Sequence, residues 1–168
     1  MKARLAWPLA AVLTLGGCTR TPSAGVNDAQ RATAPARSPL AGSWRLVWLE
    51  LPGADGALRR ISDARGSLIY TPTGQVSVQV MYASADAVAS AGPVQYVQAG
   101  YEGTFGQYVV DESTRTVTHR YEGANVRSLL GQDLPRRYEI TGNRLVLRST
   151  RADEHWSVVW ERDGLAVR

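Results

Sequence analysis

Residues 66–82 read GSLIYTPTGQVSVQVMY, and this stretch decides the fold. Segments 66–70 and 75–82 alternate between apolar and polar residues, as half-buried strands do, and Thr71-Pro72-Thr73-Gly74 lies between them. Proline presets the backbone for the second position of a type I turn, and glycine relieves the strained exit at the fourth position. The stretch therefore predicts an antiparallel β-hairpin.

Short alternating runs of the same kind continue on both sides of this hairpin. They cover residues 42–51, 100–111, 115–122, 134–141, 144–149 and 155–162. An antiparallel sheet of about eight strands can close into a barrel whose interior holds packed side chains or one small ligand. We therefore expect an all-β, antiparallel, up-and-down barrel with one or two short helical turns and no long helix. Residues 82–92, which are rich in Ala, Ser and Asp, are predicted to form a lid or a crossover.

The first and last runs of the predicted barrel carry four of the tryptophans. Alternation places Trp44 and Trp48 on one face of the first run, and Trp156 and Trp160 on one face of the last. We interpret them as core and barrel-end packing; a platform that stacks against a sugar or a lipid is the alternative.

The N-terminus has the pattern of a secretion signal. Lys2 and Arg4 precede an apolar run at residues 5–15, and Leu15-Gly16-Gly17-Cys18 ends it. As a helix the run would span about 16 Å, roughly half of a hydrocarbon core, so it predicts a signal peptide and not a transmembrane anchor. Leu-Gly-Gly-Cys resembles the lipobox of bacterial lipoproteins. The resemblance implies a signal peptide at residues 1–17 and lipid attachment at Cys18; an ordinary secretory leader with a stray cysteine is the alternative.

The segment after the cysteine is predicted to be a tether. Residues 18–39 are built mainly from Thr, Pro, Ser, Ala, Gly and Arg, a composition that favours disorder, and the folded domain is expected at residues 40–168. A flexible tether of about 20 residues reaches roughly 25 Å. Thr19 follows the cysteine, and by the lipoprotein resemblance the absence of Asp there favours the outer membrane. We expect a domain held by its lipid in the cell envelope, on the periplasmic face of the outer membrane.

Composition argues against several classes of function. Cys18 is the only cysteine, so no intramolecular disulfide and no cysteine-rich metal site can form. The formal net charge is +4, and loss of Lys2 and Arg4 with the leader lowers it to +2, with basic residues dispersed among acidic ones. This does not indicate nucleic-acid binding. The two histidines do not have the spacing of metal ligands, and no phosphate loop, dinucleotide motif or nucleophile elbow is present, so we expect no metal and no cofactor. A monomer is the default expectation. Arg59-Arg60 is interpreted as solvated loop.

Several blocks of the folded part resemble the bacterial lipocalin-like domain family, in the family's order. They are residues 40–47, residues 66–79, Val117-Thr118-His119, Glu122-Gly123, Gly131, residues 136–139, residues 143–145 and Trp160-Glu161-Arg162. The resemblance implies a calyx-like barrel, a shape that hosts carriers and a few isomerase- or hydratase-type enzymes. It also implies that one end of the barrel is closed by Gly42, Trp44, Trp160 and Arg162, with the indole of Trp44 packed under Arg162. Residues 124–130 depart from the family pattern.

Two ionisable residues fall on faces that are otherwise apolar. His119 lies between Val117 and Tyr121, and Arg136 is in phase with Tyr138. A buried imidazole and a buried guanidinium need polar partners. The candidate partners are Tyr101, Tyr108, Tyr121 and Glu122, although Glu122 falls on the opposite face unless a bulge intervenes. The candidate ligand contacts are His119, Tyr121, Arg136, Tyr138, Tyr101 and Tyr108. A polar cluster in an apolar cavity suits a ligand with a carboxylate, phosphate or carbonyl head and a hydrophobic body; a satisfied network that fixes strand register is the alternative.

Three functions fit these observations. The first is a non-enzymatic, lipid-anchored protein that binds a small hydrophobic or amphipathic molecule in its barrel. The second is an isomerase, cyclase or hydratase in which His119 acts as general acid or base and Arg136 or Tyr121 stabilises an oxyanion. The third is a solid barrel with a structural or interaction role. The volume and lining of the barrel interior distinguish the first from the third.

Overall fold

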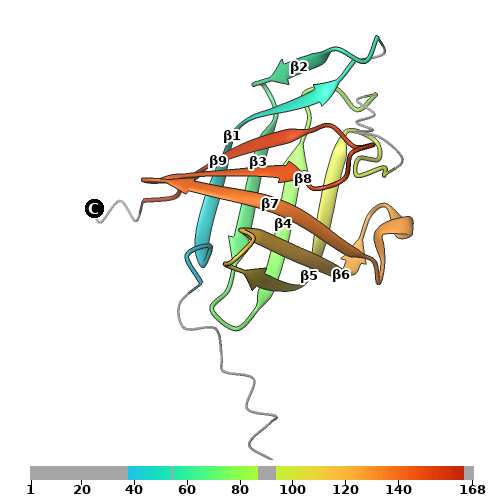
Figure 1. Cartoon of the computed structure of the whole chain (residues 1–168). Helices are drawn as coiled ribbons and strands as arrows, with labels where there is room; N and C mark the ends of the chain where they lie inside the picture. The colour runs from blue at the N-terminus through green and yellow to red at the C-terminus, as the bar shows by residue number, and fades with distance from the viewer. Residues whose placement is uncertain (1–37, 54, 87–93, 165–168) are drawn as a thin grey trace, which may run out of the picture. The chain divides into compact units, whose positions relative to one another are not determined.

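The computed structural model describes residues 38–53, 55–86 and 94–164, which form nine strands and one short 3-10 helix (Figure 1). The strands are β1 (Gly42–Pro52), β2 (Leu58–Ile61), β3 (Arg65–Tyr70), β4 (Gln75–Met81), β5 (Tyr101–Asp111), β6 (Thr116–Ala124), β7 (Asp133–Thr141), β8 (Arg144–Ser149) and β9 (Ser157–Arg162). The helix, η2 (Arg127–Leu129), lies between β6 and β7. No helix in this described part has the length and apolar character needed to cross a membrane.

The sheet is antiparallel throughout and closes on itself. Its strand order is β2-β1-β3-β4-β5-β6-β7-β8-β9, and an additional pairing joins β1 to β9. The closed ring therefore contains β1 and β3 to β9, while β2 pairs with the end of β1 beyond β3 (Figure 1). The predicted all-β antiparallel barrel of about eight strands is confirmed.

The hairpin at residues 66–82 forms as its sequence predicts. Tyr70 pairs with Val76 across β3 and β4, and the amide of Gly74 donates to the carbonyl of Thr71 at 3.2 Å. Gly74 has a φ of 89°, a conformation that side chains with a Cβ rarely adopt. The glycine therefore allows the turn to return the chain into β4.

Two features of the fold, an additional strand and a β-bulge, were not predicted. β2 contains Arg59 and Arg60, which we expected in a loop; both are exposed, and Arg60 packs over Trp48 at 4.0 Å from the ring centroid. A β-bulge in β1 between Leu46 and Trp48 then shifts the phase of the strand by one residue. Trp48 consequently lies on the outer face, whereas Leu49 is buried with 2% of its surface exposed. The prediction that Trp48 shares the face of Trp44 is wrong.

One end of the barrel is closed by side chains from the first and last strands. The guanidinium carbon of Arg162 lies 4.1 Å from the ring centroid of Trp44, and its nitrogens donate to the carbonyls of Ala41 at 2.8 Å and Pro39 at 2.9 Å. Gly42 has a φ of 135°, and a Cβ there would lie 2.6 Å from a guanidinium nitrogen of Arg162. The interior at this end is filled by large buried side chains, including Leu40, Trp44, Tyr70, Val117 and Leu145.

The predicted leader, the predicted lipid attachment site at Cys18 and the predicted tether at residues 18–39 lie outside the described residues, except for Ser38 and Pro39. The same holds for residues 87–92 of the predicted lid or crossover. Residues 94–98, which follow it in the connection between β4 and β5, are described and run over the end of the barrel opposite Arg162.

Candidate ligand-binding pocket

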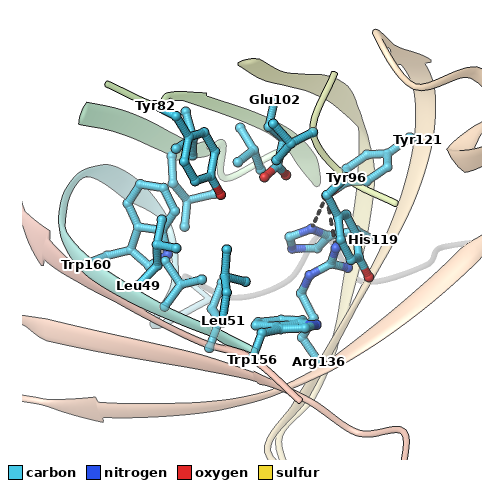
Figure 2. Close-up of a pocket in the computed structure, with 16 residues that line it drawn as sticks. Leu49, Leu51, Tyr82, Tyr96, Glu102, His119, Tyr121, Arg136, Trp156 and Trp160 are labelled. Atoms are coloured by element: carbon cyan, nitrogen blue, oxygen red, sulfur yellow. Dashed lines mark hydrogen bonds between the residues drawn. The ribbon is translucent and has the colours of Figure 1, made fainter. Parts of the chain in front are cut away.

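A pocket occupies the barrel interior at the end away from Trp44 and Arg162. It lies where β1, β4, β6 and β8 end and where β5, β7 and β9 begin. Strand alternation supplies its largely apolar wall, which includes Leu49, Leu51, Val80, Leu147, Val158 and Trp160. Figure 2 shows the labelled side chains arranged around a central space. The barrel is therefore solid at one end and hollow at the other.

A chain of polar side chains crosses the floor of the pocket. The hydroxyl of Tyr70 lies 2.7 Å from Nε2 of His119, and Nδ1 of His119 lies 3.2 Å from the hydroxyl of Tyr121. Nη2 of Arg136 donates to the same Tyr121 hydroxyl at 3.2 Å (Figure 2). A neutral imidazole has one donor and one acceptor nitrogen, and a hydroxyl can serve either. Both ring nitrogens of His119 are therefore satisfied.

Burial and one positive charge set the protonation of this chain. Burial, helped by the charge of Arg136, holds the pKa of His119 well below its ordinary 6.5, so the ring is neutral at physiological pH. Burial also raises the pKa values of Tyr70 and Tyr121, although the positive charge of Arg136 opposes this. Tyr70, His119 and Tyr121 are consequently uncharged, and Arg136 carries the only charge among these four hydrogen-bonded side chains.

The guanidinium of Arg136 is buried without a carboxylate partner. The residue is 5% exposed, and Nη1 donates to the carbonyl of Leu134 at 2.7 Å. Its guanidinium carbon lies 5.6 Å from the ring centroids of Tyr96 and Trp156, which stabilises the cation through their π systems. Across residues 38–53, 55–86 and 94–164, Arg136 forms no salt bridge. A buried, unpaired cation of this kind is costly unless something else compensates its charge.

Glu102 brings a carboxyl group into the same pocket from the start of β5. Its side chain points inward from the side opposite Trp156 (Figure 2). Desolvation raises the pKa of Glu102 to about 7, with the positive charge of Arg136 acting in the other direction. Near neutral pH the carboxyl is therefore about half protonated and compensates Arg136 only in part.

Two indole N–H groups in the pocket lack an acceptor. Nε1 of Trp156 and Nε1 of Trp160 are buried and have no hydrogen-bond partner among the described residues. Both residues line the pocket. Buried donors are usually paired, so these two, with the unused N–H groups of Arg136, make the pocket rich in donors.

Part of the connection between β4 and β5 covers the pocket. Tyr96 and Val97 are buried there and line it. The hydroxyl of Tyr96 donates to Oε1 of Glu154 at 2.8 Å, and Oγ of Ser149 donates to Oε2 of the same carboxylate at 2.6 Å. Glu154 is 4% exposed and lies in the connection between β8 and β9. The carboxylate thus fastens the covering segment to the opposite side of the barrel.

The pocket is small. Its volume is about 60 Å³, and the empty space between its side chains is about 600 Å³ when the part open to solvent is included. Pockets for drug-sized ligands measure roughly 300–1,000 Å³. The interior therefore accepts a head group and a few carbons as it stands, and the remainder of a longer molecule would lie in the open part.

The structure separates the six predicted ligand contacts into two groups. His119, Tyr121 and Arg136 line the pocket together. The other three do not line it, each for its own reason. Tyr101 lies on the outer face of β5, Tyr108 donates its hydroxyl to the carbonyl of Thr71 at the closed end, and Tyr138 packs near the turn between β5 and β6.

The sequence reading missed several pocket residues that the structure supplies. Glu102 is the most important; stepping back from the inward-facing Tyr108 in twos places residues 106, 104 and 102 on the inner face, and this signal was available. Trp160, predicted at the closed end, lines the pocket instead. Tyr96 lies in a non-alternating connection, so no periodicity could have identified it.

Few kinds of chemistry fit the described residues. No group of three or more metal-binding side chains occurs among them. His119 is 1% exposed, and tyrosine hydroxyls occupy both of its nitrogens, so it has no free nitrogen with which to take a proton from a bound molecule. The other polar groups of the pocket are donors, one cation and the Glu102 carboxyl, set in an apolar wall that is suited to binding.

Comparison with known proteins gives one match to a family. A profile described as a lipocalin-like domain matches residues 41–164. The chain matches none of the curated proteins.

The similar solved structures include the following two. One is a lipocalin-like protein from Bacteroides uniformis, with 14% identity, a TM-score of 0.43, and coverage of 74% of this chain and 98% of that one. The other is an uncharacterized protein from Bacteroides eggerthii, with 14% identity, a TM-score of 0.44, and coverage of 74% and 99%. At this similarity neither structure bears on the function of this chain.

Proposed function

Because the chain belongs to the lipocalin-like domain family, we propose that it is a non-enzymatic binding protein that holds a small amphipathic molecule in the hollow half of its barrel. One observation carries the proposal: among the described residues, an apolar pocket contains a buried guanidinium without a salt-bridge partner and two indole N–H groups without an acceptor. A bound molecule with an apolar body and an accepting head would satisfy these donors and cover the wall.

The interior also bears on the two other functions. A solid barrel would be filled along its whole length, whereas here a pocket remains at the end away from Trp44. An enzyme that used His119 would need one ring nitrogen to face the substrate, and Tyr70 and Tyr121 occupy both. We therefore favour binding over both.

The second part of the proposal concerns location. We infer that lipid on Cys18 anchors the protein in the cell envelope, on the periplasmic side of the outer membrane. Leu15-Gly16-Gly17-Cys18 after a short apolar run supports the anchor, and Thr19 supports the choice of membrane. A Cys18→Ser variant should appear in the soluble envelope fraction with its barrel intact. A variant that still carries lipid and stays with the membrane would refute the anchor.

Binding is tested on the full chain purified from its own envelope. Native mass spectrometry should detect a small molecule at a ratio of about one per chain. A Val158→Phe variant, which fills the pocket, should lose it, because Val158 lies in the apolar wall. Val109→Phe is the matched control, since Val109 is 73% exposed on the outer face. A protein that carries no molecule, or a Val158→Phe variant that carries as much as the control, would refute the proposal.

A further inference from the structure

We propose that the bound molecule is a monocarboxylate with an aliphatic body, and that Arg136 holds its carboxylate inside the barrel. This inference rests on the proposed binding function and specifies the class of ligand. It makes the pocket selective for one charge and one head-group shape.

The first argument is the unpaired charge. Arg136 is 5% exposed and forms no salt bridge within the described residues. Of its five N–H donors, one is used by Leu134 and one by Tyr121. The remaining donors have no acceptor in the described part of the protein. A ligand carboxylate would supply both the missing acceptors and the missing negative charge.

The second argument is the number of charges. Arg136 is the only arginine or lysine among the described residues that line the pocket, and His119 is neutral. A single negative charge balances a single guanidinium. A phosphate monoester carries nearly two negative charges at neutral pH, and the surplus would be buried against an apolar wall and near Glu102, at high cost. A planar guanidinium also matches the two oxygens of a carboxylate in shape.

The third argument is the surroundings of the guanidinium. Trp156 lies with its ring centroid 5.6 Å from the guanidinium carbon, and its indole N–H lacks a partner. A carboxylate next to Arg136 thus has a second type of donor close by. Leu49, Val158 and other apolar side chains line the wall beyond the charged group and suit an aliphatic chain.

Glu102 strengthens the argument. It is the only carboxyl-bearing residue that lines the pocket among the described residues, and it makes no salt bridge with Arg136. Its pKa of about 7 leaves much of it neutral at physiological pH. The pocket therefore keeps its cation available to an incoming anion.

The test compares four probes that share one body and differ in the head: octanoate, 1-octanol, octylamine and octyl phosphate. Isothermal titration calorimetry on the delipidated full chain should give the tightest binding for octanoate, by about tenfold to a hundredfold over 1-octanol, as expected for charge-assisted hydrogen bonds in a buried site. Octylamine should bind most weakly, and octyl phosphate should bind more weakly than octanoate.

Variants at two adjacent arginines supply the control. Arg136→Met should bind octanoate and 1-octanol about equally, with 1-octanol affinity unchanged or higher. Arg137→Met should keep the preference, because Arg137 lies on the exposed face of the same strand. Arg136→Lys keeps the charge and should retain part of the preference for octanoate. It replaces Arg136→Met as the test variant if Arg136→Met does not fold.

The outcomes separate this inference from the binding function itself. If octanol binds as tightly as octanoate to the unaltered protein, or if octyl phosphate binds more tightly, the carboxylate assignment is wrong while binding stands. If neither Arg136 variant changes the preference, the role of Arg136 is wrong. If none of the probes binds and no molecule is recovered from the native protein, both proposals fail.

Discussion

The hydroxyl of Tyr70 and Nε2 of His119 lie 2.7 Å apart, although β3 and β6 are not neighbours in the sheet. The hydrogen bond therefore crosses the barrel interior. It joins the filled end, where Tyr70 is 1% exposed and packs on Tyr108, to the pocket, where His119 contacts Tyr121. The packing of one half thus positions the polar floor of the other.

Loss of this bond should cost stability. Tyr70→Phe should lower the free energy of unfolding by about 1–2 kcal/mol. His119→Leu should lower it by about 2–4 kcal/mol, because it removes two hydrogen bonds and leaves the buried Tyr70 hydroxyl without a partner, while Tyr121 keeps only Arg136. Urea denaturation of both variants and of the double variant should show coupling of about 1 kcal/mol or more. Tyr101→Phe on the outer face should change little. Additive effects of the two substitutions would contradict the interpretation.

Ligand affinity should depend on pH through Glu102. The groups facing its carboxyl are Arg136 from β7, Tyr121 from β6 and Tyr82 from β4, and of these only Arg136 is charged near neutral pH. As pH rises through about 7, Glu102 becomes negative and competes with a bound anion for Arg136. Octanoate binding, measured from about pH 6 to about pH 8, should weaken several-fold in the unaltered protein and stay level in Glu102→Gln.

The same carboxyl should affect stability in a defined direction. Burial raises the pKa of Glu102 from 4.5 to about 7, so the folded state binds more protons than the unfolded state between these values. Stability relative to Glu102→Gln should therefore be greatest below about pH 4.5 and fall as pH rises through 7. Urea denaturation at a series of pH values tests this; a difference that grows with pH would show that the sign is wrong.

Gly42 should not tolerate a side chain. Gly42→Ala combines a φ of 135° with a Cβ placed 2.6 Å from Nη1 of Arg162. It should lower the free energy of unfolding by about 2–4 kcal/mol, measured by thermal or urea denaturation. Gly131→Ala is the control, since its φ is 71° but its Cβ would meet open space. The difference between the two reports the contact with Arg162. Equal losses would mean that backbone conformation alone requires the glycine.

Tyr96→Phe should loosen the cover of the pocket. The change removes the hydroxyl that donates to Glu154 at 2.8 Å and leaves that buried carboxylate with Ser149 as a side-chain donor. Amides of residues 94–98 should exchange with solvent faster, and octanoate should dissociate faster. Tyr138→Phe, which is buried away from the pocket, should leave both rates unchanged. Unchanged exchange in Tyr96→Phe would show that the hydroxyl does not fasten the segment.

Alternation along the chain predicted the barrel and the inward direction of His119, Tyr121 and Arg136, because the period of a strand is two and one face is apolar. Alternation could not predict how far along the barrel axis each inward side chain lies. Arg136 and Tyr138 share a face, yet two residues separate them by about 7 Å along the strand, enough to place one in the pocket and the other in the filled end. Position along the barrel axis depends on register between strands, which one strand's pattern does not contain.

Bulges set a second limit. No Gly or Pro marks the phase shift between Leu46 and Trp48, so local residue preferences do not predict that Trp48 faces outward and Leu49 inward. Between Phe105 and Gly106 the register with β6 also shifts, and Glu122, considered as a partner of His119, is exposed and accepts a hydrogen bond from Gln107. These positions depend on pairing across strands and not on local preference.

The pairing of β1 with β9 has a consequence for the order of folding. Arg162 bonds to the carbonyl of Ala41, 121 residues earlier in the chain, and to that of Pro39, 123 residues earlier. The edge of β1 that pairs with β9 therefore stays unpaired until the last strand is in place. Contacts this distant in the chain form slowly, and until they form both strands expose unpaired backbone. A nascent chain that lacks only its final strand would keep two open edges. Assembly of this barrel is therefore completed only after translation of its C-terminal strand.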